Sequence, residues 1–535
     1  KIKISDINNK TFWESKGYVL PKFDIEKVRE NTLKAPVWLH FGAGNIFRAF
    51  PAALQQALLD EGLTDKGIIV CESYDEEIIE KAYAPYDNLS LVVTLKADGS
   101  MDKKIVASIV RAIAAKDNLE ELEKIFTSPT LQMVSFTITE KGYSLIDASG
   151  NYHPDVQQDL HTTYQYPKTL MGIVSYLCYK RYQAGKYPIA LVSLDNCSHN
   201  GSKLYSAVKT FAETWVKNGF VDKGFADYIS DPKQVAFPWT MIDKITPRPS
   251  EQVKSMLEED GVEDIEIIKT TKNTYVSAFV NAEETQYLVI EDTFPNSRQP
   301  LEKVGVIFTD RQTVDKVEKM KVGTCLNPLH TILAVYGCLL GYNSIAEEMK
   351  DRHLKAFIEK TAYEEGLPVV VDPGIIKPED FIEEVITKRF PNPFVPDTPQ
   401  RIACDTSQKI PVRFGETLKA YIATRKRDIS TLKYIPLFFA GWLRYLMGID
   451  DEGKPFTPSP DPMLSKLQSH IKDISLGDKG PFGDALKPIL SDSNIFGVDL
   501  YEYNLAQKVE RIFEELVAEK GAVRKTLGRY IEAEE

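Results

Sequence analysis

The sequence has few cysteines, and they are not grouped. Its six cysteines lie far apart, with no CxxC pair and no histidine cluster beside them. Disulfide scaffolds and zinc fingers need closely spaced ligands, so neither is expected to organise the fold. Scattered cysteines are typical of buried, reduced thiols in a cytoplasmic protein. We predict no metal site at Cys71, Cys178, Cys197, Cys325, Cys338 or Cys404.

Long apolar runs are also lacking. The longest apolar helical stretch that we identify covers residues 332–342, which is shorter than the ~20 residues that cross a bilayer. The first residues mix Lys, Asp, Asn and Glu and contain no apolar segment typical of a secretory signal. We therefore expect no membrane partner and a cytoplasmic location.

Positive charge is in the minority. The chain has 65 Lys and Arg residues against 77 Asp and Glu residues, which gives a formal net charge of -12. Such a balance opposes a large phosphate-neutralising surface, so we expect no nucleic-acid partner. An acidic protein can still contain a basic pocket. We expect either a monomer or a small homo-oligomer.

Patterns of buried strands and of helices alternate over the first part of the chain. At 535 residues the chain is long enough for two or more domains. Short apolar runs separated by helical spacing predict a parallel α/β sheet. The expected strands cover residues 37–41, 67–71, 91–95, 105–110, 133–137 and 189–194.

The pattern changes to helices from about residue 310. Few β-rich runs occur there, and the apolar spacing is that of helices. We predict an α/β domain over residues 1–305 and a helical domain over residues 306–535. The expected helices cover residues 315–320, 329–342, 345–361, 378–389, 414–425, 432–447, 463–471 and 501–530.

A glycine-containing turn follows the first expected strand. Gly42 and Gly44 stand between that strand and a helical pattern over residues 46–59. Such a turn lets the backbone approach a pyrophosphate at a helix N-terminus. Phe47 replaces the third glycine of the usual fingerprint, so a plain strand-to-helix turn is the alternative. Arg48, in the first helical turn, is placed to reach a phosphate.

An acidic residue ends the second expected strand. The carboxylate of Glu72 is placed to accept hydrogen bonds from the adenosine ribose and to repel a 2′-phosphate. A solvated loop acid is the alternative, because Asp75, Glu76 and Glu77 follow closely. Together with the glycine turn, Glu72 favours a dinucleotide site.

The segment 321–330 carries groups that carbonyl reduction needs. A desolvated lysine such as Lys321 takes and returns an alcohol proton, and the amide of Asn327 donates to an oxygen that gains negative charge. Asn327 and His330 are three residues apart, so they share a face if both are helical. Alternatively, Asn327 caps a helix that starts at Pro328, and His330 is a core histidine.

Three further segments contribute candidate substrate contacts. Asn196 follows a strand, where it donates to a substrate oxygen or forms an Asx-turn. Asp243 accepts from substrate hydroxyls or pairs with the adjacent Lys244. Arg389 lies before a Pro-rich turn that presents it to a polar substrate.

Together these segments resemble the polyol-specific long-chain dehydrogenase/reductase family. That family contains mannitol dehydrogenases, mannitol-1-phosphate dehydrogenase, and the fructuronate and tagaturonate reductases. The matching segments follow the family's order from about residue 37 to residue 413. They are residues 40–48, 137–143, 195–196, 237–247, 290–292, 326–330 and 389–393.

The resemblance implies an N-terminal Rossmann-type domain, a mostly helical C-terminal domain, NAD as cofactor and no catalytic metal. It assigns Lys321 as general acid/base, Asn196 and Asn327 as stabilisers of the oxyanion, and His330 as a substrate-binding catalytic residue. The implied cofactor contacts are Gly42, Gly44, Asn45, Ile46, Arg48 and Glu72, and the implied substrate contacts are Asp243, Lys244 and Arg389.

The sequence departs from the family pattern at several positions. The family commonly places the lysine five residues before the asparagine, whereas Lys321 lies six residues before Asn327. A one-residue bulge, or a helix that starts only at Asn327, accommodates the difference, and Lys319 is the alternative acid/base. Pro328 and Leu329 replace small residues, and Lys244 stands where arginine is usual.

The substrate that we favour is a keto-sugar acid, with fructuronate reduced to mannonate. Positive charge for its carboxylate is expected from His199, Lys203, Lys244 and Arg389. The alternatives within the family are mannitol 2-dehydrogenase, which interconverts fructose and mannitol, and tagaturonate reductase; a sugar phosphate is disfavoured because no second phosphate loop is visible. Two other classes stay open: an NAD-dependent epimerase and a non-catalytic NAD-binding protein.

Overall fold

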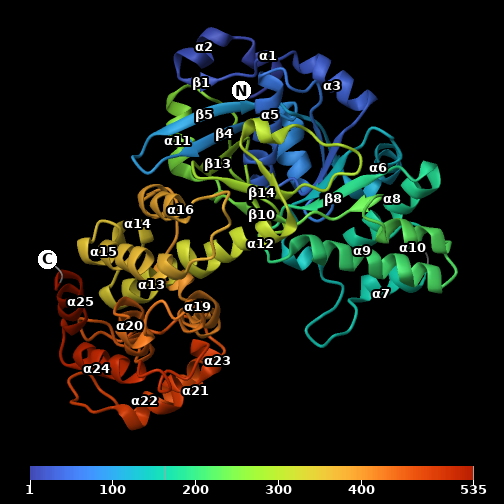
Figure 1. Ribbon diagram of the computed structural model, residues 1–535. Coiled ribbons are helices and arrows are strands. Elements are labelled where there is room, and N and C mark those ends of the chain that lie inside the picture. Colours follow the sequence, from blue (N-terminus) through green and yellow to red (C-terminus); the bar gives the residue numbers. More distant parts are fainter. Residues whose placement is uncertain (163, 534–535) are drawn as a thin grey trace. The chain divides into compact units, whose positions relative to one another are not determined.

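The computed structural model describes residues 1–162 and 164–533, and the chain divides into two compact units (Figure 1). Unit 1 comprises Lys1–Leu95 and Ser100–Asp315. Unit 2 comprises Lys96–Gly99 and Lys316–Glu535.

A six-stranded sheet forms the centre of unit 1. Its strand order is β6-β3-β2-β7-β8-β9, and every neighbouring pair is parallel. The chain winds outward in both directions from β2, which is the doubly wound order of a Rossmann fold and confirms the predicted parallel sheet. The strands are β2 (Trp38–Phe41), β3 (Ile68–Glu72), β6 (Ile109–Ala114), β7 (Met133–Phe136), β8 (Ile189–Ser193) and β9 (Val235–Ala236).

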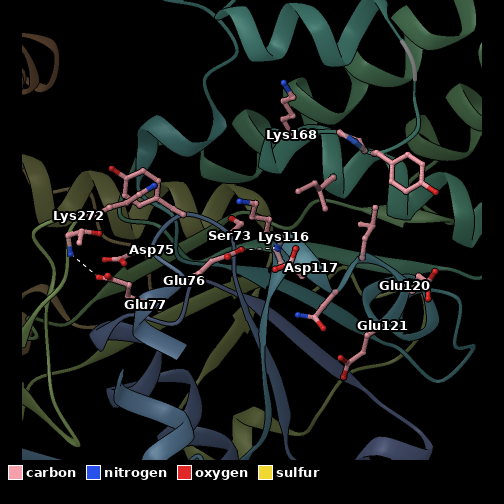
Figure 2. A pocket seen from close by; sticks show the side chains of 18 residues that line it. Ser73, Asp75, Glu76, Glu77, Lys116, Asp117, Glu120, Glu121, Lys168 and Lys272 are labelled. Carbon is pink, nitrogen blue, oxygen red and sulfur yellow. Dashed lines mark hydrogen bonds between the residues drawn. The ribbon is translucent and has the colours of Figure 1, made fainter. Parts of the chain in front are cut away.

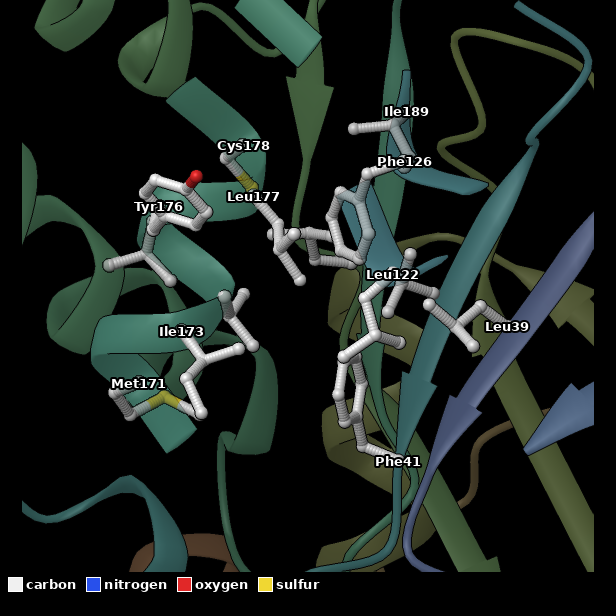
Figure 3. Packing of buried hydrophobic residues seen from close by; sticks show 14 of the residues in the cluster. Leu39, Phe41, Leu122, Phe126, Met171, Ile173, Tyr176, Leu177, Cys178 and Ile189 are labelled. Carbon is white, nitrogen blue, oxygen red and sulfur yellow. The ribbon is translucent and has the colours of Figure 1, made fainter. Parts of the chain in front are cut away.

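Alternate residues of these strands supply the two faces of the sheet. Leu39 and Phe41 point to the face covered by helices, where they join Phe126, Leu177 and Ile189 in one buried cluster (Figure 3). The covering helices are α6 (Leu119–Phe126), α8 (Leu170–Gly185) and α9 (Asn200–Lys217). Burying each such side chain contributes about 1.5–3 kcal/mol. This core fixes the strand ends at which the candidate site lies.

Two expected strands belong to another sheet. Residues 91–95 form β4 (Ser90–Leu95), which pairs antiparallel with β5 (Met101–Val106). The run 105–110 is not one strand, because β5 ends at Val106 and β6 begins at Ile109. An apolar run shows that a strand is buried but not which strand it pairs with. Placing residues 91–95 and 105–106 in the parallel sheet was therefore wrong, whereas residues 109–110 begin β6 of that sheet. The second sheet has the order β1-β5-β4-β13, with β1 (Tyr18–Val19) and β13 (Phe279–Glu283) at its edges.

Unit 2 is built of helices, as predicted. In the part of unit 2 that the structure describes, no strand is assigned. The predicted helices at 378–389, 414–425, 432–447 and 463–471 correspond to α16 (Pro378–Glu384) with a following π turn, α19 (Glu416–Thr424), α20 (Tyr434–Leu446) and α21 (Leu464–Ile471).

Two expected helices of unit 2 are each divided. The segment 345–361 forms α14 (Ile345–Glu348) and α15 (Arg352–Lys360), because the Asp351 carboxylate accepts from the backbone N–H of His353 and starts a new helix. The segment 501–530 forms α24 (Ala506–Val517) and α25 (Ala522–Glu532). Gly521 separates them with a φ of +82°, a backbone conformation that favours glycine.

The longest continuous helical run extends from Arg311 to Leu340. It joins α12 (Arg311–Met320), a π turn (Lys321–Cys325) and α13 (Asn327–Leu340). The run has 30 residues and is long and apolar enough to cross a membrane by length and composition, with 78% of its most apolar window buried inside the fold. The expected apolar helical stretch at 332–342 was therefore too short.

Candidate active site

The turn after β2 requires glycine at its first position. Gly42 has a φ of +115°, and a Cβ atom there would lie 2.2 Å from the carbonyl oxygen of Thr137. At Gly44 an added Cβ would meet nothing within 4 Å, so this side of the turn is open. Helix α4 (Asn45–Ala49) follows at once. At Gly44 the turn thus leaves room beside the backbone at a helix start, which is where a pyrophosphate group binds.

An aromatic stack replaces the missing third glycine. The Phe47 ring lies 4.2 Å from the His40 ring at an interplanar angle of 11°. The two ring nitrogens of His40 lie 2.6 Å from the Ser135 hydroxyl and 2.7 Å from the Thr137 hydroxyl. Burial lowers the pKa of His40 to about 3, so the ring is neutral. Helix α4 is therefore held to the strands by packing where glycine normally permits close approach.

Arg48 lies beneath the turn. Its side chain is fully buried, its Nε donates to the Ser90 hydroxyl at 2.9 Å, and its guanidinium lies 5.3 Å from the centre of the Tyr83 ring. The Tyr83 hydroxyl in turn donates to the Ala43 carbonyl at 2.8 Å. Burial lowers the pKa of Arg48. Arg48 supports the turn from inside unit 1, and its contact with a phosphate stays a prediction.

The helical pattern predicted at residues 46–59 is broken. Helix α4 ends at Ala49, and α5 (Pro51–Asp60) begins at a proline, which lacks the N–H that would continue the ladder. Asn45 donates its amide to the Tyr275 carbonyl at 3.4 Å. The break lets Asn45 and Ile46 occupy a short turn of their own at the end of the sheet.

Glu72 ties two loops together at the carboxyl end of β3. One carboxylate oxygen accepts from the Ala43 N–H at 3.1 Å, and the other accepts from the Ser73 and Tyr74 N–H groups at 3.1 and 3.2 Å. Glu72 is 8% exposed, and burial raises its pKa against the lowering effect of these bonds. The carboxylate therefore fixes the glycine turn against the loop that follows β3.

A pocket of about 1010 Å³ opens beside Glu72, at the carboxyl ends of β3 and β6. Figure 2 shows the carboxyl groups of Asp75, Glu76 and Glu77 on one side of it and those of Glu120 and Glu121 on the other. Its size, and its position in the crevice outside the strand ends, fit the adenosine part of a dinucleotide. Its acidic lining favours ribose hydroxyls and disfavours a 2′-phosphate.

The three acids that follow Glu72 have backbone or hydroxyl partners. Asp75 accepts from the Thr270 hydroxyl at 2.6 Å, Glu76 accepts from the Lys116 N–H at 2.8 Å, and Glu77 accepts from the Thr271 N–H at 2.8 Å. These bonds order the loops that line the pocket.

A second cleft of unit 1, of about 360 Å³, lies at the carboxyl end of β8. It brings together four residues that the sequence predicted separately, and Ile46 connects it to the glycine turn. The predicted residues that line it are Ile46, Asn196, Asp243 and Lys244. The cleft therefore combines an amide, a carboxylate and an ammonium group next to the candidate dinucleotide site.

Asp195 and Asn200 order this cleft, and neither was predicted as a site residue. The Asp195 carboxylate accepts from the N–H groups of Ile138 and Thr139 at 3.0 and 2.8 Å and from the Tyr143 hydroxyl. The Asn200 amide donates to the carbonyls of residues 193 and 195 at 3.1 and 3.0 Å. The polar run Asp-Asn directly after a buried strand was the available signal.

Lys244 follows β10 (Thr240–Asp243) on the wall of this cleft. Its ammonium donates to the Gln286 side chain at 2.7 Å and lies 5.4 Å from the centre of the Phe50 ring. Burial lowers its pKa to about 8. Asp243 is 6% exposed, and its backbone pairs with Tyr287.

Two cations expected to face a carboxylate have acidic partners within unit 1. The Nε2 atom of His199 lies 2.8 Å from Asp315, and its ring stacks on Trp239 at 4.1 Å. Lys203 forms an ion pair with Glu140. Sequence spacing did not reveal these partners, and the expectation that both residues supply charge for a substrate carboxylate stays a prediction.

In unit 2 a π turn accommodates the extra residue between lysine and asparagine. The turn covers Lys321–Cys325, and the N–H of Leu326 donates to the Lys321 carbonyl at 3.1 Å, five residues back. A π turn inserts one residue into a helix. Lys321 is 5% exposed, whereas Lys319 is exposed. The structure thus contains the one-residue bulge and favours Lys321 over Lys319 as the buried amine.

Helix α13 begins at Asn327 itself. Leu326 precedes the helix, and no side chain caps it, so Asn327 is not the N-cap that the alternative interpretation required. Pro328 takes the next position, where its missing N–H costs nothing. Because both Asn327 and His330 are helical, they lie on one face of α13.

His330 is a neutral histidine whose side chain is 19% exposed. Its ring stacks on Phe390 with the centroids 5.2 Å apart, and its Nε2 lies 3.6 Å from the nearer Asp397 carboxylate oxygen. Burial, together with nearby cations, lowers its pKa to about 3. These cations are Arg413, Arg389, Arg401 and Lys409.

Three of these four cations were not predicted as site residues. Lys409 and Arg413 are four residues apart, a helical spacing that was the available signal, whereas Arg401 belongs to a separate helix. Arg401 pairs with Asp397, and the Lys409 ammonium donates to the Ile402 carbonyl at 2.8 Å. Arg389, which was predicted, is 3% exposed. Unit 2 therefore surrounds His330 with positive charge.

Side chains that could bind a metal ion do not form a cluster in the part of the chain that the structure describes. Within residues 1–162 and 164–533, no three His, Cys, Asp or Glu side chains are close enough to hold one ion.

Replacing Glu72 tests the clamp on the glycine turn. In Glu72→Gln one of the two acceptor oxygens becomes an NH2 group facing N–H donors, so we expect a loss of about 1–3 kcal/mol of stability and weaker NADH binding. Thermal unfolding and a fluorescence titration with NADH measure both. Glu76→Gln is the matched control for stability, because the Glu76 carboxylate accepts from one backbone N–H, that of Lys116, rather than from three; an equal loss of stability in the two variants would contradict the role of Glu72.

Comparisons with known proteins agree with these features. The mannitol dehydrogenase Rossmann domain matches residues 37–303, and the mannitol dehydrogenase C-terminal domain matches residues 313–517. The chain is 53% identical to D-mannonate oxidoreductase of Thermotoga maritima over 534 residues, which cover 99% of this chain and 98% of that protein.

Two solved structures are also similar. One is substrate-free D-sorbitol dehydrogenase, with 25% identity, a TM-score of 0.78 and coverage of 96% of this chain and 97% of that one. The other is mannitol 2-dehydrogenase of Pseudomonas fluorescens in a ternary complex with NAD and D-mannitol, with 27% identity, a TM-score of 0.68 and coverage of 98% and 99%. The chain belongs to the mannitol dehydrogenase family.

Proposed function

We propose that the protein is an NAD(H)-dependent oxidoreductase that interconverts D-fructuronate and D-mannonate. The observation that carries this proposal is the identity of 53% to a D-mannonate oxidoreductase along nearly the whole of both chains. The cationic surroundings of His330 support it, because a sugar acid carries a carboxylate and a polyol does not.

The proposed cofactor is held by unit 1. Gly42 permits the tight turn, Gly44 leaves the backbone open for the pyrophosphate, and the acidic pocket beside Glu72 takes the adenosine. Bound NADH supplies the hydride that reduces the carbonyl carbon. Asn45, Ile46 and Arg48 complete the proposed cofactor contacts, with Arg48 acting through the shape of the turn.

Lys321 is proposed to supply the proton. Reduction of a ketone adds a hydride to carbon and a proton to oxygen, and a positioned ammonium group delivers that proton. The amides of Asn327 and Asn196 are proposed to donate to the same oxygen as it gains charge. In the direction of oxidation, Lys321 as a neutral amine accepts the alcohol proton.

The remaining candidate residues are proposed to bind the sugar acid. His330 is neutral, so it donates or accepts one hydrogen bond without adding charge. Asp243 accepts from hydroxyl groups, and Lys244 and Arg389 contribute positive charge.

We further propose that catalysis is metal-independent and takes place in the cytoplasm. Side chains carry both the proton transfer and the charge stabilisation in this mechanism, so no step needs a Lewis acid. All six cysteines are free thiols in the structure, as expected in a reducing compartment.

Substrate preference tests the proposal most simply. Purified protein with NADH should reduce fructuronate faster than fructose or tagaturonate at equal concentration, followed by loss of NADH absorbance. A higher rate with fructose would favour a mannitol 2-dehydrogenase. Turnover of a sugar acid without net loss of NADH would indicate an epimerase, and NADH binding without any turnover would indicate a binding protein.

Lysine variants test the acid/base assignment. Lys321→Ala should lower turnover by about 10²–10⁴-fold, the contribution of a positioned acid/base, with NADH affinity near normal. Lys319→Ala is the matched control and should leave turnover unchanged, because that side chain is exposed. A large loss in the Lys319 variant alone would reverse the assignment.

The pH dependence tests the state of His330. Because its pKa is lowered to about 3, the ring stays neutral at every pH above that value. The profile of kcat/KM for reduction should therefore show no inflection at about 6.5, the ordinary histidine value, that depends on this residue. His330→Ala should lower the rate without changing the profile; an inflection that vanishes in the variant would show that His330 titrates during turnover.

A further inference from the structure

Arg413 is a partly buried cation next to His330. It lies in a π turn (Pro411–Gly415), and its Nη1 donates to the hydroxyl of Thr331 at 2.6 Å. Thr331 is fully buried and directly follows His330 in α13. The guanidinium of Arg413 therefore lies beside the helix turn that carries the candidate catalytic residues.

The charge of Arg413 is not balanced by an acid. Burial lowers its pKa to about 10, and it forms no ion pair with any acidic side chain of the described chain. Neighbouring Arg401, by contrast, pairs with Asp397. Even a partly buried arginine is usually paired with a carboxylate, because removing an uncompensated charge from water costs free energy. An arginine left without an acid beside a candidate substrate-binding residue is suited to an anionic ligand.

The surroundings of Arg413 connect it to the acid/base as well. Together with Gly323, Thr324 and Pro328 it lines a small cavity of about 10 Å³. Gly323 and Thr324 belong to the π turn that begins at Lys321. Of the cations near His330, Arg413 has the largest effect in lowering the pKa of that histidine.

We propose that Arg413 binds the carboxylate of the sugar acid and thereby selects it over an uncharged ketose. This inference rests on the proposed function and assigns its specificity to one side chain. A guanidinium matches a carboxylate with two parallel N–H donors, which an ammonium does not. The hydrogen bond to Thr331 uses Nη1 and orients the planar group.

A purely structural role is the competing explanation. Arg413 would then serve only to hold Thr331 and the first turns of α13. A neutral donor is sufficient for that task, so charge and hydrogen bonding can be separated. Arg413→Gln keeps a donor for Thr331 and removes the charge, Arg413→Lys keeps the charge and removes the fork, and Thr331→Val removes the hydrogen bond alone.

The experiment measures kcat and KM for fructuronate and for fructose in the wild-type enzyme and these variants. Lys419→Met is the matched control, because Lys419 is a half-exposed cation of the neighbouring helix α19. We expect Arg413→Gln to lower kcat/KM for fructuronate by about 10²-fold, the size of a lost charge-assisted bond, mainly through a higher KM. Fructose reduction should change little, and Arg413→Lys should retain part of the preference.

The outcomes separate this inference from the proposed function. A wild-type enzyme that rejects fructuronate refutes both, and this is seen before any variant is made. If the wild type accepts fructuronate but Arg413→Gln loses activity equally on both substrates, or Thr331→Val reproduces its effect, Arg413 is only structural. Unchanged fructuronate kinetics in Arg413→Gln would also overturn the inference. Thermal unfolding of each variant identifies a general loss of stability.

Discussion

One extra residue in a long helix sets the arrangement of the candidate catalytic groups. The run from Arg311 to Leu340 is not α-helical throughout, and its π turn at Lys321–Cys325 accommodates the extra residue. The turn buries Lys321, leaves Lys319 exposed, and starts α13 at Asn327. π turns weaken a helix locally and recur at functional sites. Here the π turn begins at Lys321, the residue to which we assign proton transfer.

In unit 1 carboxylates order the ends of parallel strands. The Glu72 carboxylate, after β3, accepts hydrogen bonds from three backbone N–H groups. The Asp195 carboxylate, after β8, accepts hydrogen bonds from two backbone N–H groups. Strand ends leave such N–H groups without ladder partners, and an acid satisfies several at once. Both candidate ligand-binding edges of unit 1 are therefore ordered without a ligand. Binding then requires little reordering of the loops.

Local features of the site could be predicted from sequence, whereas long-range partners could not. The strand, glycine turn and helix around Gly42 follow from neighbouring residues, and so does the bulge implied by the spacing of Lys321 and Asn327. The sheet membership of residues 91–95 depends on distant strands, and the acidic partners of His199 and Lys203 depend on the folded surface. The cations around His330 come from separate helices, so only Arg389 was expected.

A crystal structure of the enzyme with NAD⁺ and mannonate tests the central claim, that Lys321 carries the proton, most directly. The account predicts the Lys321 ammonium at hydrogen-bonding distance, about 2.7–3.2 Å, from the substrate oxygen that is oxidised, with the amide of Asn327 on the same atom. A complex in which that oxygen contacts Lys319, or no lysine at all, would contradict it.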